Sequence, residues 1–430
     1  MTATTGSPRT GPDPAANPAA GAPKRPPRRS GGWRTGLVVV LAVLAVLSTT
    51  VTLTGIPQLT SSSTTQAAVR LALPILLAAL GGLWAERAGV VNIGLEGMMI
   101  LGTWGAAWAG YQWGPWAAIV AGAVFGALGG LLHAVATVRF GVNHIVSGVA
   151  INLLGAGVTR YLSTLVFFPI SQNPRQSPRV EPFETFSAQP LADWLGEVEE
   201  GQRFLLADAA GILRGLISGV SPLVLLAFLL VPVSWYVLWR TAFGLRLRSC
   251  GENPVAAESL GVDVYRYKYV AVVISGALAG LGGAALVLNP GQSGYLEGQT
   301  NGRGFIGLAA MIFGNWRPGG LLAGSAMFGY ADGLQLRGGG GVVIALLYAA
   351  TLALALVVVW QLVRRRWFGA TAAAVGALIC YAVYWSTEEL PDELTTYAPH
   401  LTTLVVLAVA SQRLRMPAAD GVVYRRGEGD

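Results

Sequence analysis

The stretch that decides the fold is RTAFGLRLRSCGENPVAAESLGVDVYRYK, residues 240–268, a polar island between two long apolar runs. Its basic residues are Arg240, Arg246, Arg248, Arg266 and Lys268. Because an excess of Lys and Arg beside membrane-spanning helices marks the cytoplasmic side, the stretch is predicted to be a cytosolic loop. A short Ala-rich helix is expected at its centre, from Asn253 to Gly261. Asn253 would be its N-cap, Pro254 its first helical residue and Gly261 its stop.

The composition around this loop is that of a membrane protein. The 430 residues are 53% hydrophobic and only 12% charged, whereas soluble domains carry roughly 25% charged residues. The apolar runs predict an all-α polytopic membrane protein with about 10–12 transmembrane segments, since each span needs about 20 mostly apolar residues. The net charge of +7 lies in loops and tails and shows no nucleic-acid-binding pattern. Two cysteines far apart predict neither a disulfide framework nor a metal site.

The chain divides into four predicted parts. Residues 1–33, rich in Pro, Ala, Gly and Ser and carrying basic residues, are predicted to be a disordered cytosolic tail. Residues 34–366 form the transmembrane core, whose first span, 36–56, is too long for a signal peptide. Within the core, 169–217 has seven acids against four arginines and is predicted to be an extracytoplasmic loop. Residues 367–412 are expected to form additional spans. Residues 413–430 are expected to form a second cytosolic tail, so that both termini are cytosolic.

Charge placement also predicts a break in one apolar run. If residues 304–332 formed a single helix, the basic cluster 364–366 would lie outside and the acidic residues 388–393 inside, against the charge bias at both places. A break at GNWRPG, residues 314–319, corrects both, because Pro and Gly end helices. The run is therefore predicted to be two short segments, 303–314 and 319–334. Spans at 342–362, 369–384 and 400–410 are expected to follow.

A short pattern occurs twice. Ile-Gly-Leu-x-x-Met at residues 93–98 recurs at residues 306–311. In the predicted topology the two copies run in opposite directions across the membrane. Two halves of opposite orientation with Gly-interrupted segments are a common transporter plan, so the core is predicted to consist of two inverted-topology halves with interrupted helices.

Three motifs resemble those of ABC importer permeases of the nucleoside and simple-sugar group, which are related to branched-chain amino acid permeases. They are VVNIGLEG at 90–97, GENPVAAESLG at 251–261, and GRGFIGLA at 302–309 with GNWRPG after it. Together they span residues 86 to 330, and the remaining parts of the chain carry no recognisable motif.

The resemblance implies a set of partners. The loop residues Gly251, Glu252, Asn253, Pro254, Ala256, Ala257 and Gly261 would couple the permease to a cytosolic ABC ATPase. A second permease subunit, homologous or identical, and an extracytoplasmic substrate-binding lipoprotein or periplasmic protein are also implied. This chain has no P-loop and no catalytic constellation, so ATP hydrolysis is expected on the partner subunit, and no cofactor or metal is expected here.

Four polar residues are candidates for the translocation path: Asn92, Glu96, Asn152 and Asn301. An acid inside an apolar segment is a functional hypothesis by default, but Glu96 lies near the start of its span. It either contacts substrate or a gate, or caps neighbouring backbone amides, or pairs with Arg87. Asn92 either binds a sugar hydroxyl or caps a helix, and Asn301 either faces a pore mouth or lies in a loop.

Three other functions stay open. A branched-chain amino acid permease would share the same motifs. An ion-coupled secondary transporter would need ionisable residues at mid-span, and such acids are scarce here. A non-transporting membrane scaffold is a third possibility. Loss of uptake on changing Glu252 and Asn253, with normal membrane insertion, would argue against it.

Overall fold

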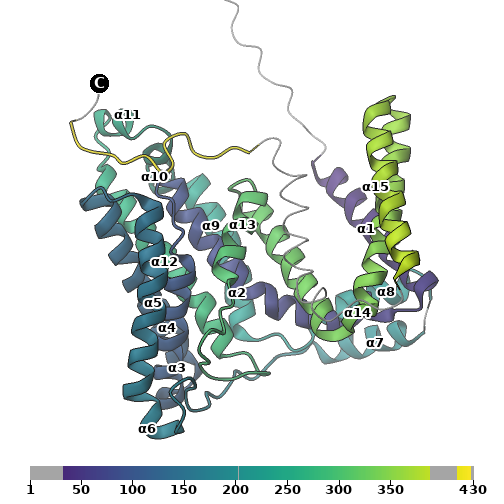
Figure 1. Cartoon of the computed structure of the whole chain (residues 1–430), viewed down its shortest axis with the longest axis horizontal. Helices are drawn as coiled ribbons and strands as arrows, with labels where there is room; N and C mark the ends of the chain where they lie inside the picture. The colour runs from purple at the N-terminus through teal and green to yellow at the C-terminus, as the bar shows by residue number, and fades with distance from the viewer. Residues whose placement is uncertain (1–31, 202, 388–413, 428–430) are drawn as a thin grey trace, which may run out of the picture. The chain divides into compact units, whose positions relative to one another are not determined.

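The computed structural model describes residues 32–201, 203–387 and 414–427 (Figure 1). Most of the predicted N-terminal tail and the predicted span at 400–410 therefore lie outside the described residues. The chain divides into two units, Met1–Val43 and Leu44–Asp430, and the boundary falls within α1. All packing described below belongs to the second unit.

The described residues are almost entirely helical. The long helices are α1 (Gly32–Thr54), α2 (Ser62–Arg87), α3 (Leu95–Trp113), α4 (Pro115–Ala134), α5 (His144–Val166), α9 (Pro222–Arg240), α12 (Val264–Val287), α14 (Pro318–Val363) and α15 (Trp367–Ser386). The shorter ones are α6 (Phe168–Ser171), α7 (Gln189–Glu200), α8 (Leu206–Ile217), α10 (Ala242–Glu252), α11 (Pro254–Ser259) and α13 (Arg303–Phe313). Among the described residues, eight helical segments are long and apolar enough to cross a membrane. The predicted all-α polytopic fold is confirmed.

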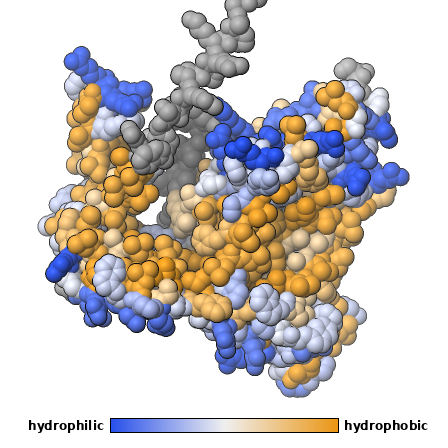
Figure 2. Space-filling view, turned by 180° about the vertical axis from the view of Figure 1, so that it is seen from behind, coloured by the Kyte–Doolittle hydropathy of each residue, from blue (hydrophilic) through white to orange (hydrophobic). Residues whose placement is uncertain are grey.

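Apolar side chains cover much of the outer surface of these helices. Figure 2 shows hydrophobic residues across the middle of the visible face and hydrophilic residues toward its upper and lower edges. On α5, for example, Leu153 is 71% exposed. A soluble protein seldom leaves such large contiguous apolar areas in water, whereas lipid is the natural environment for them.

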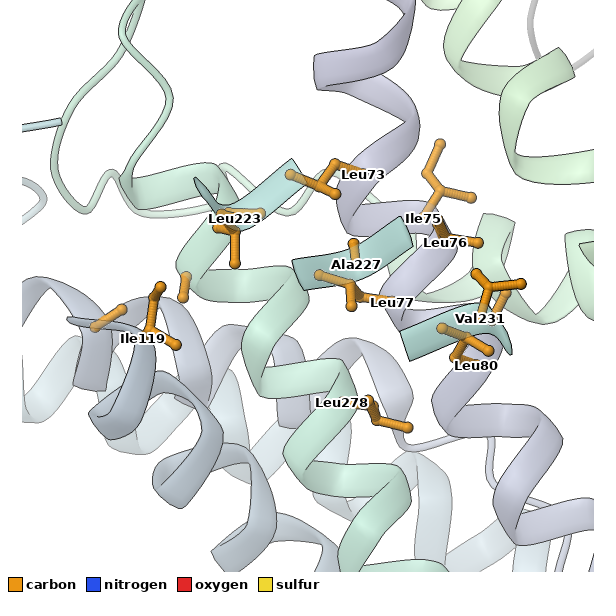
Figure 3. Packing of buried hydrophobic residues seen from close by; sticks show 14 of the residues in the cluster. Leu73, Ile75, Leu76, Leu77, Leu80, Ile119, Leu223, Ala227, Val231 and Leu278 are labelled. Carbon is orange, nitrogen blue, oxygen red and sulfur yellow. The ribbon is translucent and has the colours of Figure 1, made fainter. Parts of the chain in front are cut away.

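Helix α2 is at the centre of the core. It packs against α8, α9, α12, α13 and α14. Figure 3 shows its leucines among apolar residues of α9 and α12. The labelled members of this cluster are Leu73, Ile75, Leu76, Leu77, Leu80, Ile119, Leu223, Ala227, Val231 and Leu278. Most of the α2 side chains in this cluster are fully buried because neighbours surround the helix on several sides.

Helices α4 and α12 meet through glycines. A Cβ added at Gly126 would lie 2.3 Å from the carbonyl oxygen of Gly276, and one added at Gly280 would lie 2.1 Å from the carbonyl oxygen of Gly122. Small residues at such an interface let two backbones approach closely in a membrane, where association depends on packing. The abundance of glycine in the sequence has its structural reason here.

The predicted break after residue 313 is confirmed. Helix α13 ends at Phe313, and α14 begins at Pro318. The predicted break between the segment at 319–334 and the span at 342–362 is absent, because α14 continues as one helix from Pro318 to Val363. The span itself is confirmed as an apolar helical segment, since Ile344–Val363 is long and apolar enough to cross a membrane. The four glycines at 338–341 lower helix propensity, but glycine keeps its N–H donor and does not end a helix as proline does.

The region 169–217 is more ordered than the sequence analysis expects. It contains α7 and α8, which pack against each other, and α8 also packs on α2. The backbone N–H of Ser62 donates to Glu199 (3.0 Å), and Arg214 pairs with the same carboxylate (3.2 Å). The spacing of Ala192, Leu195 and Gly196, the buried residues of α7, is that of an amphipathic helix. The sequence analysis relied on the many acidic residues of this region and therefore predicted a loop instead of an amphipathic helix.

Candidate functional site

The loop predicted to couple the chain to an ATPase folds as two helices, α10 and α11, which share Asn253. This residue ends α10, and its side-chain oxygen accepts a hydrogen bond from the Ala256 N–H (3.0 Å), so that it is the N-cap of α11. Pro254 is the first residue of α11, and Gly261 has a φ of +82° just beyond its end. These local features agree with the sequence analysis, except that α11 is shorter and is preceded by a separate helix.

The two faces of α11 differ. Pro254 and Ala257 are buried, and Ala257 belongs to a small apolar cluster with Cys250 and Val264. Ala256 faces outward, as do Val255, which is 44% exposed, and Leu260, which is 84% exposed. The helix therefore presents an apolar edge that nothing in the described part of the chain covers.

Arg87, the last residue of α2, connects α10 to the turn between α13 and α14. Its guanidinium donates to the carbonyl oxygen of Trp316 (2.7 Å from Nη2) and lies 3.9 Å from Glu252. It also lies over the ring of Trp239, at 5.4 Å. Behind it, Gly251 is packed so closely that an added Cβ would lie 2.4 Å from the Arg87 carbonyl oxygen. A movement of α10 would thus be passed directly to α2.

The turn itself is fixed by Trp316. Its indole N–H donates to Glu86 Oε2 (2.5 Å), and both Asn315 and Trp316 have positive φ values, 52° and 53°. Gly314 allows the turn to close, since a Cβ there would lie 2.2 Å from the Leu321 nitrogen. The sequence analysis identified the turn but not its connection to Glu86, because the two residues are 230 positions apart.

Glu96 caps the helix that carries the second copy of the repeated pattern. Its two carboxylate oxygens accept from the backbone N–H groups of Gly302 (2.9 Å) and Gly304 (2.6 Å), at the start of α13. A negative charge at a helix N-terminus is favourable because unpaired N–H groups point there. Of the alternatives left open for Glu96, the structure gives backbone capping, while Arg87 pairs elsewhere.

The segment 88–94, between α2 and α3, is irregular backbone, most of which is buried between helices. Both backbone groups of Val91 are held by histidines: the N–H donates to His144 Nδ1 (3.3 Å), and the carbonyl oxygen lies 3.1 Å from His133 Nε2. Asn152 supports the same segment, donating to the Ile93 carbonyl oxygen (3.1 Å). Sequence reasoning missed the two histidines because their partner is a backbone group.

The other candidates for the translocation path lie in different surroundings. Asn92 is fully buried, and its amide donates to Ser275 Oγ of α12 (2.9 Å). The Asn152 side-chain oxygen accepts from the Gly97 N–H (2.7 Å). Asn301 is exposed, with a φ of 43°, just before α13. The structure thus brings Asn92, Glu96 and Asn152 together around the start of α3, and Asn301 lies near Glu96 at the start of α13.

The fold and these contacts define an all-helical, multi-pass membrane protein. The family model for the branched-chain amino acid transport system permease component matches residues 64–341. The chain therefore belongs to this permease family, and the resemblance drawn from the three motifs is confirmed.

Three individual relatives each cover more than four fifths of the chain. The guanosine ABC transporter permease protein NupQ of Bacillus subtilis is 37% identical over 83% of this chain and 94% of its own length. The nucleoside ABC transporter permease protein NupC of Lactococcus lactis is 33% identical over 82% and 93%. The putative glucose ABC transporter permease protein TsgC13 of Haloferax volcanii is 34% identical over 84% and 96%. A second Bacillus subtilis guanosine permease protein, NupP, is 26% identical over 272 residues. No solved structure matches.

Proposed function

We propose that this chain is a permease subunit of an ABC importer for nucleosides, with simple sugars as the second substrate class. The names of the relatives support both classes. The observation that carries the coupling role is α11. A six-residue helix is too short to be stable alone, yet this one is capped, fixed to the bundle and left with an apolar edge. A groove on a separate ATPase subunit would cover that edge.

The contacts of Arg87 suggest how ATP could drive the cycle. If closure of the ATPase displaced α11, α10 would move with it. The contacts of Arg87 with Glu252 and Trp316 would pass the motion to α2 and to the turn before α14. ATP would then shift the population between inward-facing and outward-facing states by its different affinity for each. This mechanism needs no nucleotide site in the permease.

The remaining partners and the orientation follow from the same proposal. The α10–α11 region and residues 414–427 would face the cytosol. Helices α7 and α8, at the other end of α2, would face outward and receive the substrate-binding protein. NupQ and NupP suggest paired permeases, and this chain is more similar to the first, so we propose a homologous and not identical permease as its partner. Asn92, Glu96, Asn152 and Asn301 remain candidates for the translocation path or its support.

The coupling role can be tested at Leu260. In vesicles containing the complete transporter, we expect ATP-dependent uptake of radiolabelled guanosine. A Leu260→Asp variant should lose at least about 90% of it, because burying an unpaired carboxylate in an apolar groove is strongly unfavourable. Leu260→Met, which keeps the apolar contact, is the matched control and should transport like the unmodified protein.

Two results would contradict the proposal. Uptake that persists without ATP in vesicles carrying an ion gradient would identify a secondary transporter. Uptake of leucine that guanosine and glucose fail to inhibit would identify a branched-chain amino acid permease.

A further inference from the structure

The C-terminal segment 414–427 lies against the α10–α11 region, beside which Figure 1 shows it in yellow. Backbone N–H groups in its first half donate hydrogen bonds to two different parts of the chain. The N–H of Arg415 donates to Asn315 Oδ1 (2.7 Å), and the N–H of Ala419 donates to the Gly251 carbonyl oxygen (2.9 Å). The segment thus contacts both the α13–α14 turn and the end of α10.

The second half of the segment holds α11 through Glu258. The hydroxyl of Tyr424 donates to one oxygen of this carboxylate, and Arg426 Nε donates to the other (2.9 Å). The Tyr424 ring also packs against Tyr265 near the start of α12, with centroids 5.5 Å apart, and lies against the apolar cluster of Cys250, Ala257 and Val264. Tyr424 therefore bridges α11 and α12.

Between these halves, Asp420 points into the junction. Both of its carboxylate oxygens are shielded from solvent. The charged groups that face it are Glu86 and Arg87 at the end of α2 and Lys268 on α12. Burial raises the pKa of Asp420 to about 7. The segment is thus attached at three points, to the α13–α14 turn, to α10–α11 and to the ends of α2 and α12.

The segment leaves the outer edge of α11 uncovered. Val255 and Leu260 remain exposed, and the side chain of Arg426, which pairs with Glu258 on the same helix, is 80% exposed. Arg415 and Arg425 are exposed as well. A blocking segment would be expected to cover the apolar edge, whereas this one leaves the edge open and exposes arginine side chains of its own.

We propose that residues 414–427 form a strap that fixes α10 and α11 to the bundle and, together with the exposed edge of α11, makes one docking surface for the ATPase subunit. This inference rests on the proposed function. The charge pattern fits an ATPase surface with an apolar groove rimmed by carboxylates, since complementary charge sets orientation and association rate. A rigidly held α11 would also transmit displacement with less loss than a loosely attached one.

The test compares the full-length chain with one that ends at residue 413 and with Tyr424→Phe/Arg426→Gln, each in the complete transporter. Both variants should reach the membrane at normal levels, retain less ATPase on purification, and transport at least fivefold less guanosine per ATP hydrolysed. The double variant Glu258→Arg/Arg426→Glu exchanges the two charges and keeps an ion pair between α11 and the strap. It should therefore recover part of the ATPase retention and transport that the other two variants lose. Arg175→Gln, which removes a comparable ion pair with Glu297 (3.5 Å), is the control and should have no effect.

Other outcomes separate the strap from the function it rests on. Unchanged coupling in both variants would overturn the strap. Increased uptake would also overturn it, and would indicate an inhibitory segment. If the full-length chain itself showed no ATP-dependent uptake, the proposed importer function would fail first.

Docking of the strap should weaken as pH rises. Because the docked Asp420 has a pKa of about 7, above the value of an exposed aspartate, the docked state binds the proton more tightly. Protonation of Asp420 therefore favours binding of the strap to the bundle below pH 7, and this stabilisation is lost above pH 7. The equilibrium constant for binding of the strap to the bundle should fall about tenfold between pH 6 and pH 8.

A nitroxide label on Val422→Cys, in a Cys380→Ser background, would report the mobile fraction of the strap. Cys250 is buried and burial raises its pKa to about 11, so it should stay unlabelled. Asp420→Asn should make the mobile fraction of the strap independent of pH over this range. If the pH dependence were unchanged in that variant, a group other than Asp420 would be responsible for it.

Discussion

Replacing Gly280 by valine is expected to abolish the folded protein. A Cβ at this position would lie 2.1 Å from the Gly122 carbonyl oxygen and 2.8 Å from Gly126 Cα. Both are backbone atoms of α4, so no side-chain rotation can relieve the clash, and the two helices would have to separate along their length. Overpacking of a core costs typically 1–3 kcal/mol and occasionally more; we expect more than about 3 kcal/mol here, since the obstacle is backbone.

The matched control is Gly157→Val. Gly157 also lies inside a membrane helix, α5, but an added Cβ there meets no atom within 4 Å. Size-exclusion chromatography of detergent extracts should show a single sharp peak for this control and aggregate for Gly280→Val. A monodisperse Gly280→Val protein with unchanged thermal stability would mean that α4 and α12 are not in the close contact described.

Replacing Glu96 by alanine should give the second large effect. The change leaves the N–H groups of Gly302 and Gly304 without their acceptor, and each buried, unsatisfied donor costs about 1–3 kcal/mol. The expected loss of stability is therefore about 2–6 kcal/mol. Glu96→Gln keeps one acceptor oxygen and should lie between the alanine variant and the unmodified protein.

Thermal unfolding in detergent measures this difference, with Glu197→Ala, an exposed acid on α7, as the control. Transport assays add a second readout. If Glu96→Gln kept full stability but lost uptake, the carboxylate would be acting on substrate or a gate and not as a cap for α13.

Local features were predictable from the sequence because their causes are local. The proline and glycines clustered at residues 314–319 favour the end of one helix and the start of the next, and Asn253-Pro254 favours a helix start. Charge bias also predicts which loops face the cytosol, and that orientation stays a prediction. The predicted separation of 319–334 from 342–362 failed, because the glycines at 338–341 lie inside α14 and weaken the helix without ending it.

Contacts between distant parts of the chain could not be predicted in this way. Glu96 and Gly302 are 206 positions apart, and Glu258 and Tyr424 are 166 apart. Periodicity and composition carry no information on such pairs. The C-terminal segment has no apolar pattern and reads as a solvated tail, although several of its hydrogen bonds use backbone groups that any sequence would supply.

The cap on α13 has an evolutionary consequence. The two halves of the repeat cannot drift as independent modules, because the acid in one half completes the first turn of a helix in the other. A chimera that combined one half with that of a distant permease would inherit a helix start without its acceptor, or an acceptor without its helix. Successful recombination between such proteins should therefore carry both motifs across together.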